Sequence, residues 1–197
     1  MRRFIGYYKW HLLFLLLVII CIAFVLFNMT TTVTPDMVIA YADTRYIDTQ
    51  VFNDNKHTWE HWLQDANNDE KKVANLIAYT ADLQKDLDEL FVKLVEEDTN
   101  DIYIMSKTTF ENFEDKSVFV DVRYFAEINE ERNEVLKDED GKIYAVSLEG
   151  NKFAKDLGII DSTDLYLAVC ESKEEELPVA RKNGRNIAST IINSENN

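Results

Sequence analysis

The longest apolar run in the chain extends from Leu12 to Phe27, sixteen residues without a charge, an amide, a Gly or a Pro. With two interfacial residues added at each end the run reaches twenty residues, or about 30 Å as a helix. This length matches the hydrocarbon core of a bilayer. The pattern predicts a transmembrane helix over residues 12–29, which makes the lipid bilayer the first expected partner.

A cleaved secretory signal is the competing interpretation, because Arg2, Arg3 and Lys9 precede the apolar run. Residues 28–30, Asn-Met-Thr, offer no small-x-small cleavage site, so we expect an uncleaved signal anchor. The cations predict a single-pass protein of the cell membrane with residues 1–11 in the cytoplasm and the C-terminal domain outside.

After a polar tether at 30–36, short apolar runs alternate with amphipathic segments through a domain predicted to occupy 37–197. The segment 127–140 is highly charged and is expected to be a solvated helix or loop. The predicted strands or extended segments are 37–42, 73–79, 101–105, 118–122, 141–146 and 165–170.

The clearest helix outside the anchor is expected to follow Thr80, a candidate N-cap. Its apolar residues recur on one face, and the opposite face is charged. The stripe consists of Leu83, Leu87, Leu90, Phe91 and Leu94.

Three further helices are predicted, at 47–63, at 108–113 and from near Pro178 toward the C-terminus. Pro178 is suited to a helix start, whereas Gly184 should weaken the last helix. The apolar faces expected for the first and last of these helices are Val51, Trp59, Trp62 and Leu63, and Ala180, Ile187, Ile191 and Ile192. Strands alternating with helices predict an α/β fold with a mostly parallel sheet and helices on both faces.

Charge restricts the partners of the exterior domain. Residues 30–197 carry 18 of the 21 Lys and Arg and all 36 Asp and Glu. This acidic domain is not expected to bind nucleic acid, because its field repels phosphate. Neutral, cationic or divalent partners remain, as does a purely solubilising role. Cys170 lies outside the anchor and Cys21 within it, so no intramolecular disulfide is expected.

The segment His57-Thr58-Trp59-Glu60-His61 matches the H-x-x-E-H pattern of inverted zinc peptidases. Two histidines one helical turn apart can bind Zn²⁺ while the glutamate activates water. The sequence presents no distinctive third ligand, so we predict no metal and no catalytic residue. A zinc hydrolase that uses His57, Glu60 and His61 remains the enzymatic alternative.

Residues 65–70, DANNDE, begin like a calcium loop, with oxygen ligands at positions 1, 3 and 5. Glu70 stands where an EF-hand requires Gly, and Leu76 occupies the place of the bidentate glutamate. An EF-hand is therefore excluded. A turn built on Asp and Asn is the favoured interpretation, with a looser calcium site as the alternative.

Three segments in order resemble extracellular solute-binding proteins of the type 2 periplasmic-binding fold: DELFVKLVEEDTNDIYIMSKTTFENFEDKSVFVDV, GKIYAVSLEGNKFAKDLGI and DLYLAVCES. The resemblance covers Val38 to Ile192 and lies in the order of elements and the hydrophobic pattern. Two-lobed members of that family are much longer than the 168 residues from Thr30 to Asn197. The chain is more similar to small membrane-anchored relatives from Gram-positive bacteria, which have a reduced second lobe.

This resemblance implies a non-enzymatic domain, without a cofactor, that binds a small solute or a partner such as a transporter or surface protein. The ligand would lie beyond the carboxyl ends of the strands. The implied ligand-binding residues are Asp43, Thr44, Thr80, Ser106 and Lys107. Each of them is also a common cap or turn residue. A surface domain without a ligand is the remaining alternative.

Overall fold

The computed structural model describes residues 2–31, 34–172 and 176–194. The chain divides into two compact units, Met1–Thr34 and Pro35–Asn197. Each unit is described by itself.

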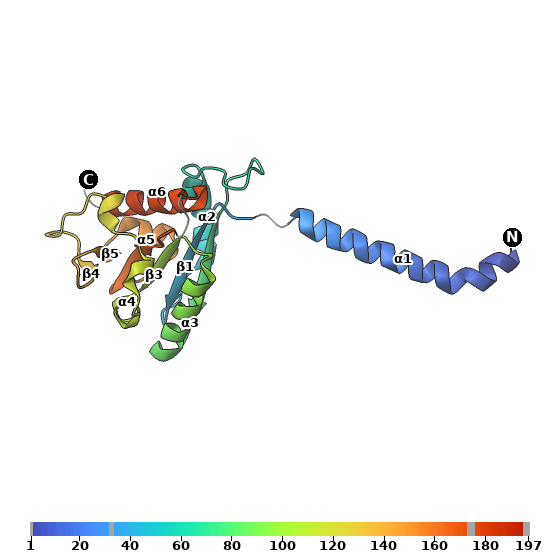
Figure 1. Cartoon of the computed structure of the whole chain (residues 1–197), viewed down its shortest axis with the longest axis horizontal. Helices are drawn as coiled ribbons and strands as arrows, with labels where there is room; N and C mark the ends of the chain where they lie inside the picture. Colours follow the sequence, from blue (N-terminus) through green and yellow to red (C-terminus); the bar gives the residue numbers. More distant parts are fainter. Residues whose placement is uncertain (1, 32–33, 173–175, 195–197) are drawn as a thin grey trace. The chain divides into compact units, whose positions relative to one another are not determined.

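In the described part of the first unit, residues 2–31 form the helix α1 (Arg2–Thr31), which includes the whole predicted span 12–29 (Figure 1). Among the residues that the structure describes, no helix combines the length and the apolarity needed to cross a membrane.

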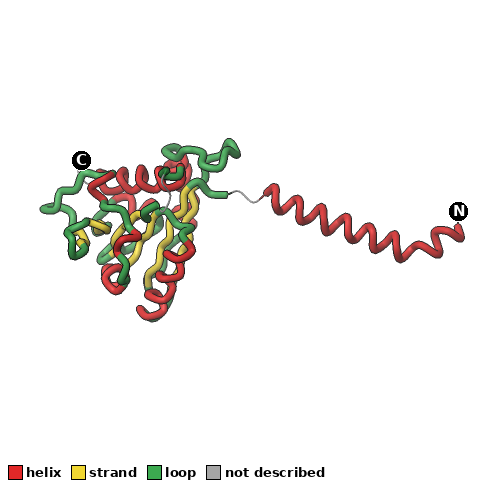
Figure 2. The backbone as a smooth tube through the Cα atoms, viewed as in Figure 1, coloured by secondary structure: helices red, strands yellow, loops and turns green. Residues whose placement is uncertain are grey.

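The second unit is built on a six-stranded sheet with the order β2-β1-β3-β6-β5-β4. Figure 2 shows its strands in yellow between the helices. Strand β1 pairs in parallel with both β2 and β3, whereas the β3–β6, β6–β5 and β5–β4 pairs are antiparallel. The strands are β1 (Met37–Asp43), β2 (Ala74–Thr80), β3 (Ile102–Ser106), β4 (Val135–Lys137), β5 (Ile143–Ser147) and β6 (Leu165–Val169).

The α/β class is confirmed, but the prediction of a mostly parallel sheet was wrong. Strands β4 and β5 are joined by a short turn through Gly141, which has a φ of 78°, and such a hairpin is antiparallel by construction. The charged segment 127–140 contains β4 and was predicted only as a helix or loop. The β6, β5 and β4 half of the sheet is therefore antiparallel, unlike the parallel arrangement predicted from alternating strands and helices.

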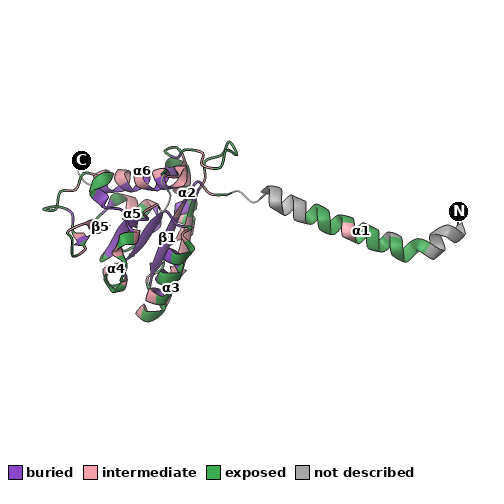
Figure 3. Ribbon diagram, in the orientation of Figure 1, coloured by how far each residue is buried: buried purple, intermediate pink, exposed green. Residues whose placement is uncertain are grey.

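Helices cover both faces of the sheet, as predicted (Figures 1 and 3). One core cluster packs α2 (Thr49–Glu60), α5 (Lys152–Asp156) and α6 (Val179–Asn193) against the sheet. The other packs α3 (Gln84–Glu97) and α4 (Lys107–Asn112) against the opposite face. Strand β1 contributes alternate side chains to the two clusters, as a strand buried on both faces must.

Helix α3 begins later than expected. Thr80 is not its N-cap but the last residue of β2, in register with Asp43 of β1. The helix starts at Gln84 after Leu83, which is 62% exposed and makes no side-chain cap. The rest of the stripe packs inward: Leu87, Phe91 and Leu94 are buried and Leu90 is half-buried.

Helix α2 is shorter than predicted, because Asp48 caps its start by accepting a hydrogen bond from the Gln50 N–H. Its buried residues are Phe52 and Trp59, and Phe52 was not on the expected face. Trp62, which was on that face, lies beyond the helix end and is 37% exposed.

The segment 118–122 is only partly extended. Its first and last residues belong to two 3₁₀ turns, Lys116–Val118 and Val122–Tyr124. An antiparallel bridge from Phe119 to Cys170 ties the segment to the sheet.

Candidate functional site

The carboxyl ends of the three parallel strands meet at one edge of the sheet. Asp43 at the end of β1 is in register with Thr80 at the end of β2, and β3 ends beside them at Ser106. The chain passes from β1 to β2 on one side and then crosses to β3 on the other, so β1 and β3 form a topological switch point. The residues implied by the resemblance thus lie at the same edge.

An ion pair between the buried Asp43 and the partly exposed Arg45 lies at this carboxyl edge. The Asp43 carboxylate is almost fully buried, and it accepts hydrogen bonds from Arg45 Nε at 2.7 Å, Nη2 at 3.0 Å and the backbone N–H at 2.9 Å. Arg45 also donates to the carbonyl oxygens of Asp161 and Thr163. The hydrogen bond to Asp43 raises the pKa of Arg45. Asp43 is therefore occupied by a neighbouring arginine rather than presented to a ligand.

Arg45 was not among the predicted site residues. The sequence did contain a signal for it, an acid and an arginine two residues apart directly after a buried strand. The bidentate geometry that joins them is the one that arginine and carboxylate favour.

The other predicted residues have local roles as well. The Ser106 hydroxyl caps α4 by accepting a hydrogen bond from the Thr109 N–H at 3.3 Å. Lys107 Nζ donates to Glu134 Oε1 at 3.1 Å. Thr44 and Thr80 are exposed beside them. Three of the five residues, Thr44, Thr80 and Lys107, thus present polar groups to solvent.

Two large apolar side chains stand exposed next to this edge. Tyr46 is 70% exposed and Ile160 is 79% exposed. An antiparallel bridge between Ile47 and Ile159 places Tyr46 and Ile160 opposite one another, next to Arg45. We call Tyr46 and Ile160 the apolar rim. The carboxyl edge therefore combines a charge-compensated centre with an exposed apolar rim.

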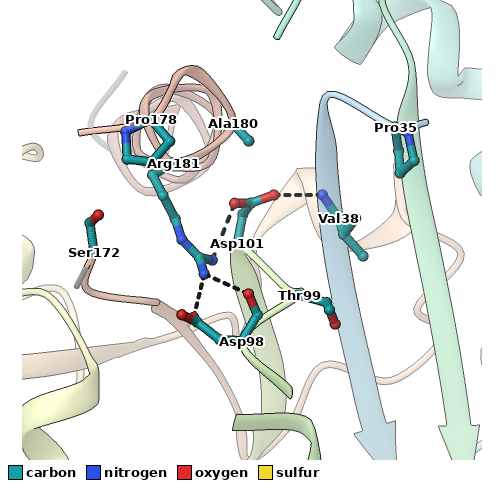
Figure 4. Close-up of a pocket in the computed structure, with 9 residues that line it drawn as sticks. All are labelled: Pro35, Val38, Asp98, Thr99, Asp101, Ser172, Pro178, Ala180 and Arg181. Atoms are coloured by element: carbon teal, nitrogen blue, oxygen red, sulfur yellow. Dashed lines mark hydrogen bonds and ion pairs between the residues drawn. The ribbon is translucent and has the colours of Figure 1, made fainter. Parts of the chain in front are cut away.

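A cavity of about 330 Å³ lies at the opposite, amino edge of the sheet, between the start of α6 and the starts of β1 and β3 (Figure 4). Its lining combines apolar and charged side chains, and sequence reasoning did not identify it. The lining residues are Pro35, Val38, Asp98, Thr99, Asp101, Ser172, Pro178, Ala180 and Arg181.

Arg181 organises this amino-edge cavity from the first turn of α6. Its side chain is 9% exposed and forms ion pairs with Asp98 at 2.5 Å and Asp101 at 3.2 Å (Figure 4). The guanidinium also donates to the backbone carbonyls of Asp98, at 3.0 Å, and Asn100. One cation thus ties the end of α3 and the start of β3 to α6.

Asp101 is the most buried acid of the cavity. Its Oδ2 accepts the Val38 N–H at 2.8 Å, and burial raises the pKa of the carboxyl despite the nearby Arg181. A Cβ added at Gly184 would lie 2.9 Å from the Asp101 Cβ. The glycine expected only to weaken the helix therefore allows α6 to approach β3 closely.

The H-x-x-E-H segment lies at the end of α2. His57 Nδ1 is 3.2 Å from Glu60 Oε2, its side chain is 83% exposed, and His61 is exposed in the C-cap position. In the described ranges of the chain, no three His, Cys, Asp or Glu side chains are grouped as metal ligands. The structure thus adds no third ligand to the two histidines.

The 65–70 loop is a turn held by its own acids, as favoured from the sequence. Asp65 accepts backbone hydrogen bonds from Asn68 at 2.7 Å and Glu70 at 2.9 Å. Asn68 and Glu70 adopt positive φ angles of 59° and 64°. The carboxylate of Asp65 therefore shapes the loop.

No protein-family model, curated protein or solved structure matches this chain.

Proposed function

We propose that this chain is a membrane-anchored, non-enzymatic recognition domain whose carboxyl edge binds a protein partner at the outer cell surface. The observation that carries the proposal is the apolar rim, because Tyr46 and Ile160 are both exposed on the two segments that the Ile47–Ile159 bridge joins. Neighbouring exposed apolar residues rimmed by polar groups are typical of interaction sites.

The ion pair at the same edge favours a protein partner over an enclosed solute. The Arg45 guanidinium already donates two hydrogen bonds to the Asp43 carboxylate. A ligand at this edge therefore contacts the rim and the exposed Thr44 and Thr80 without reaching a buried charge. A tyrosine beside an aliphatic side chain supplies contact area at low entropic cost, as at many protein interfaces.

Site-specific photo-crosslinking in intact cells tests this proposal. A photoreactive phenylalanine analogue replaces Tyr46 in one variant and Tyr124 in the control, because both tyrosines are similarly exposed, at 70% and 78%. We expect a discrete crosslinked product from position 46 and none from position 124. Substituting Ile160→Ser in the position-46 variant should reduce the product. Equal crosslinking at both positions would refute recognition by this edge.

The anchor is the second part of the proposal. It is supported by the uncharged run Leu12 to Phe27, by the unbroken helix Arg2–Thr31 and by the cations before the run. Protease added to intact cells should degrade the domain that follows residue 34 and leave the helix membrane-bound. Protection of the domain, or its recovery from the soluble fraction, would contradict the proposed topology.

A small solute bound in the amino-edge cavity is the second candidate function. About 330 Å³ falls at the lower end of the range for small-molecule sites, and the lining mixes apolar surface with Asp98 and Arg181. Because these charges pair with each other, a neutral polar solute suits the cavity best. A solute present at 100 times its Kd would add about 2.7 kcal/mol to stability. The Ala180→Trp variant, which fills the cavity, should abolish the resulting rise in melting temperature.

The zinc hydrolase has less support, because the structure supplies only His57, His61 and Glu60. We expect the double change His57→Ala with His61→Ala to leave the melting temperature within about 2 °C, the range of exposed substitutions. Stoichiometric zinc in the purified chain, together with a melting temperature that falls on adding chelator, would instead favour the zinc hydrolase as the function.

A further inference from the structure

The two edges of the sheet differ in how well they are protected against pairing with another strand. Strand β4, at one edge, has three residues, a register irregularity at Leu136/Lys137 and an exposed lysine. Short length, bulges and charges are the usual means of blocking edge-to-edge association. Strand β2, at the other edge, has seven residues, ANLIAYT, without charge or proline, and its pairing to β1 is regular. The β2 edge thus lacks the protection that the β4 edge has.

The direction of the backbone groups shows which residues of β2 are open. Val38 of β1 directs both its N–H and its C=O toward Asp101 on the β3 side, at 2.8 and 2.9 Å. Alternate residues point the other way, so Ile39 faces β2. In a parallel ladder Ile39, in register with Leu76, bonds to the residues on either side of its partner, Asn75 and Ile77.

The backbone groups of the remaining residues of β2 must point outward: Ala74, Leu76, Ala78 and Thr80. Among the described residues, none hydrogen-bonds to these groups on the outer side of the strand. The side chains of Leu76, Ile77 and Tyr79 are only half-buried. The edge therefore offers both open backbone groups and apolar surface to a further strand.

We propose that β2 is a homodimerisation edge, on which β2 of a second copy of this chain pairs antiparallel to extend the sheet across a two-fold axis. With the axis at Ile77, Leu76 of one copy faces Ala78 of the other, and Ala74 faces Thr80. All four of these residues direct their backbone groups outward. The strand is therefore self-complementary in this register.

The charges that flank β2 support a second copy as the occupant. Lys72 lies two residues before the strand and Asp82 two residues after it, and both are exposed. In the register centred on Ile77, Lys72 of each copy comes opposite Asp82 of the other. Opposite charges that face each other across a strand pair stabilise it. Two copies of so acidic a domain repel at long range, but salt at physiological strength screens this repulsion beyond about 8 Å.

Cysteine crosslinking of the full chain, in a variant that carries Cys21→Ser, tests the register directly. In the proposed dimer the Ile77 residues form a close pair with Cα atoms about 4.5 Å apart, within disulfide range. Asn75 is on the same face of β2, but the two copies of it would be four residues out of register, about 13 Å apart. Mild oxidation should therefore join Ile77→Cys chains into dimers and leave Asn75→Cys chains monomeric.

Two further variants separate specific pairing from chance collision. Ala78→Pro removes an outward N–H and leaves the pairing with β1 intact, because edge strands tolerate proline at such positions. Added to Ile77→Cys, it should lower the dimer yield roughly tenfold, the loss expected from two hydrogen bonds. Lys72→Asp should also lower the yield, and Lys72→Asp with Asp82→Lys should restore it. Equal crosslinking at positions 75 and 77, or a monomeric Ile77→Cys chain, would overturn the proposal.

Discussion

Replacing Arg181 with leucine tests how the amino edge is held together. The substitution places an apolar side chain of moderate size in the first turn of α6 and removes the cation that bridges Asp98 and Asp101. Among the described residues, Asp101 would retain the Val38 N–H, at 2.8 Å, as its one hydrogen-bond donor.

The expected loss follows from burial. Removing one partner from a buried ion pair typically costs about 3–5 kcal/mol, because the remaining charge is left uncompensated. Arg181 is 9% exposed on its side chain and Asp101 is 6% exposed, so neither charge is well solvated. Two backbone carbonyls, of Asp98 and Asn100, also lose a donor. We therefore expect a loss within this range.

Urea unfolding followed by tryptophan fluorescence measures the effect, since Trp59 is buried. With a slope of roughly 2 kcal/mol per molar urea, the midpoint should fall by about 1.5–2.5 M. Arg185→Leu is the matched control one helical turn later. Arg185 pairs with Glu171, whose side chain is 42% exposed, so this loss should stay near or below about 1 kcal/mol.

The pH dependence provides a second measurement. Burial already raises the folded-state pKa of Asp101 above its value in the unfolded chain, and removing Arg181 raises this pKa further. A carboxyl with a raised folded-state pKa binds a proton more readily in the folded chain than in the unfolded chain. It therefore destabilises the fold most at pH values above that pKa, and this destabilisation decreases as the pH falls through the pKa. The loss in unfolding free energy caused by Arg181→Leu should therefore become smaller as the pH is lowered from neutral to acidic. Equal losses for Arg181→Leu and Arg185→Leu at every pH would refute this account.

Three other predictions concern packing and reactivity. Gly184→Ala should destabilise the domain by about 1–3 kcal/mol in urea unfolding despite alanine's better helix propensity, because the added Cβ would crowd Asp101. Leu87→Ala should cost about 2–5 kcal/mol because Leu87 is fully buried, whereas Leu83→Ala, at an exposed position, should change stability by less than about 0.5 kcal/mol. Burial raises the pKa of Cys170 to about 11, so in a chain whose other cysteine is replaced by serine, alkylation at pH 8 should be slow until denaturant is added.

The sequence predicted the first half of the fold well because that half follows one simple pattern. Strands β1, β2 and β3 are apolar runs separated by helices, and periodicity locates each of them to within a few residues. The second half was harder to predict, because the order of its strands in the sheet depends on a hairpin and on pairing between distant segments. Strand β4 has only three residues in a charged segment, and β6 pairs antiparallel to β3 across more than fifty residues of intervening chain. No local pattern encodes that pairing.

The candidate site shows the same division between local and long-range information. The resemblance implied Asp43, Thr80 and Ser106 as ligand-binding residues, and the structure places them at one edge. The resemblance could not show that Arg45 pairs with Asp43, because that contact depends on how the chain turns after β1. Nor could it find Arg181, whose partner Asp101 lies eighty residues earlier in the chain.

Both ends of β1, the middle strand of the three parallel ones, are thus bounded by charges that satisfy one another. Arg45 compensates Asp43 at the carboxyl end of β1, and Arg181 compensates Asp101 beside its amino end. Such pairs hold loops and helices in place. The apolar rim and the open backbone of β2 instead gain contacts when another surface covers them. These two features are the ones on which we base the proposal that this surface recognises proteins.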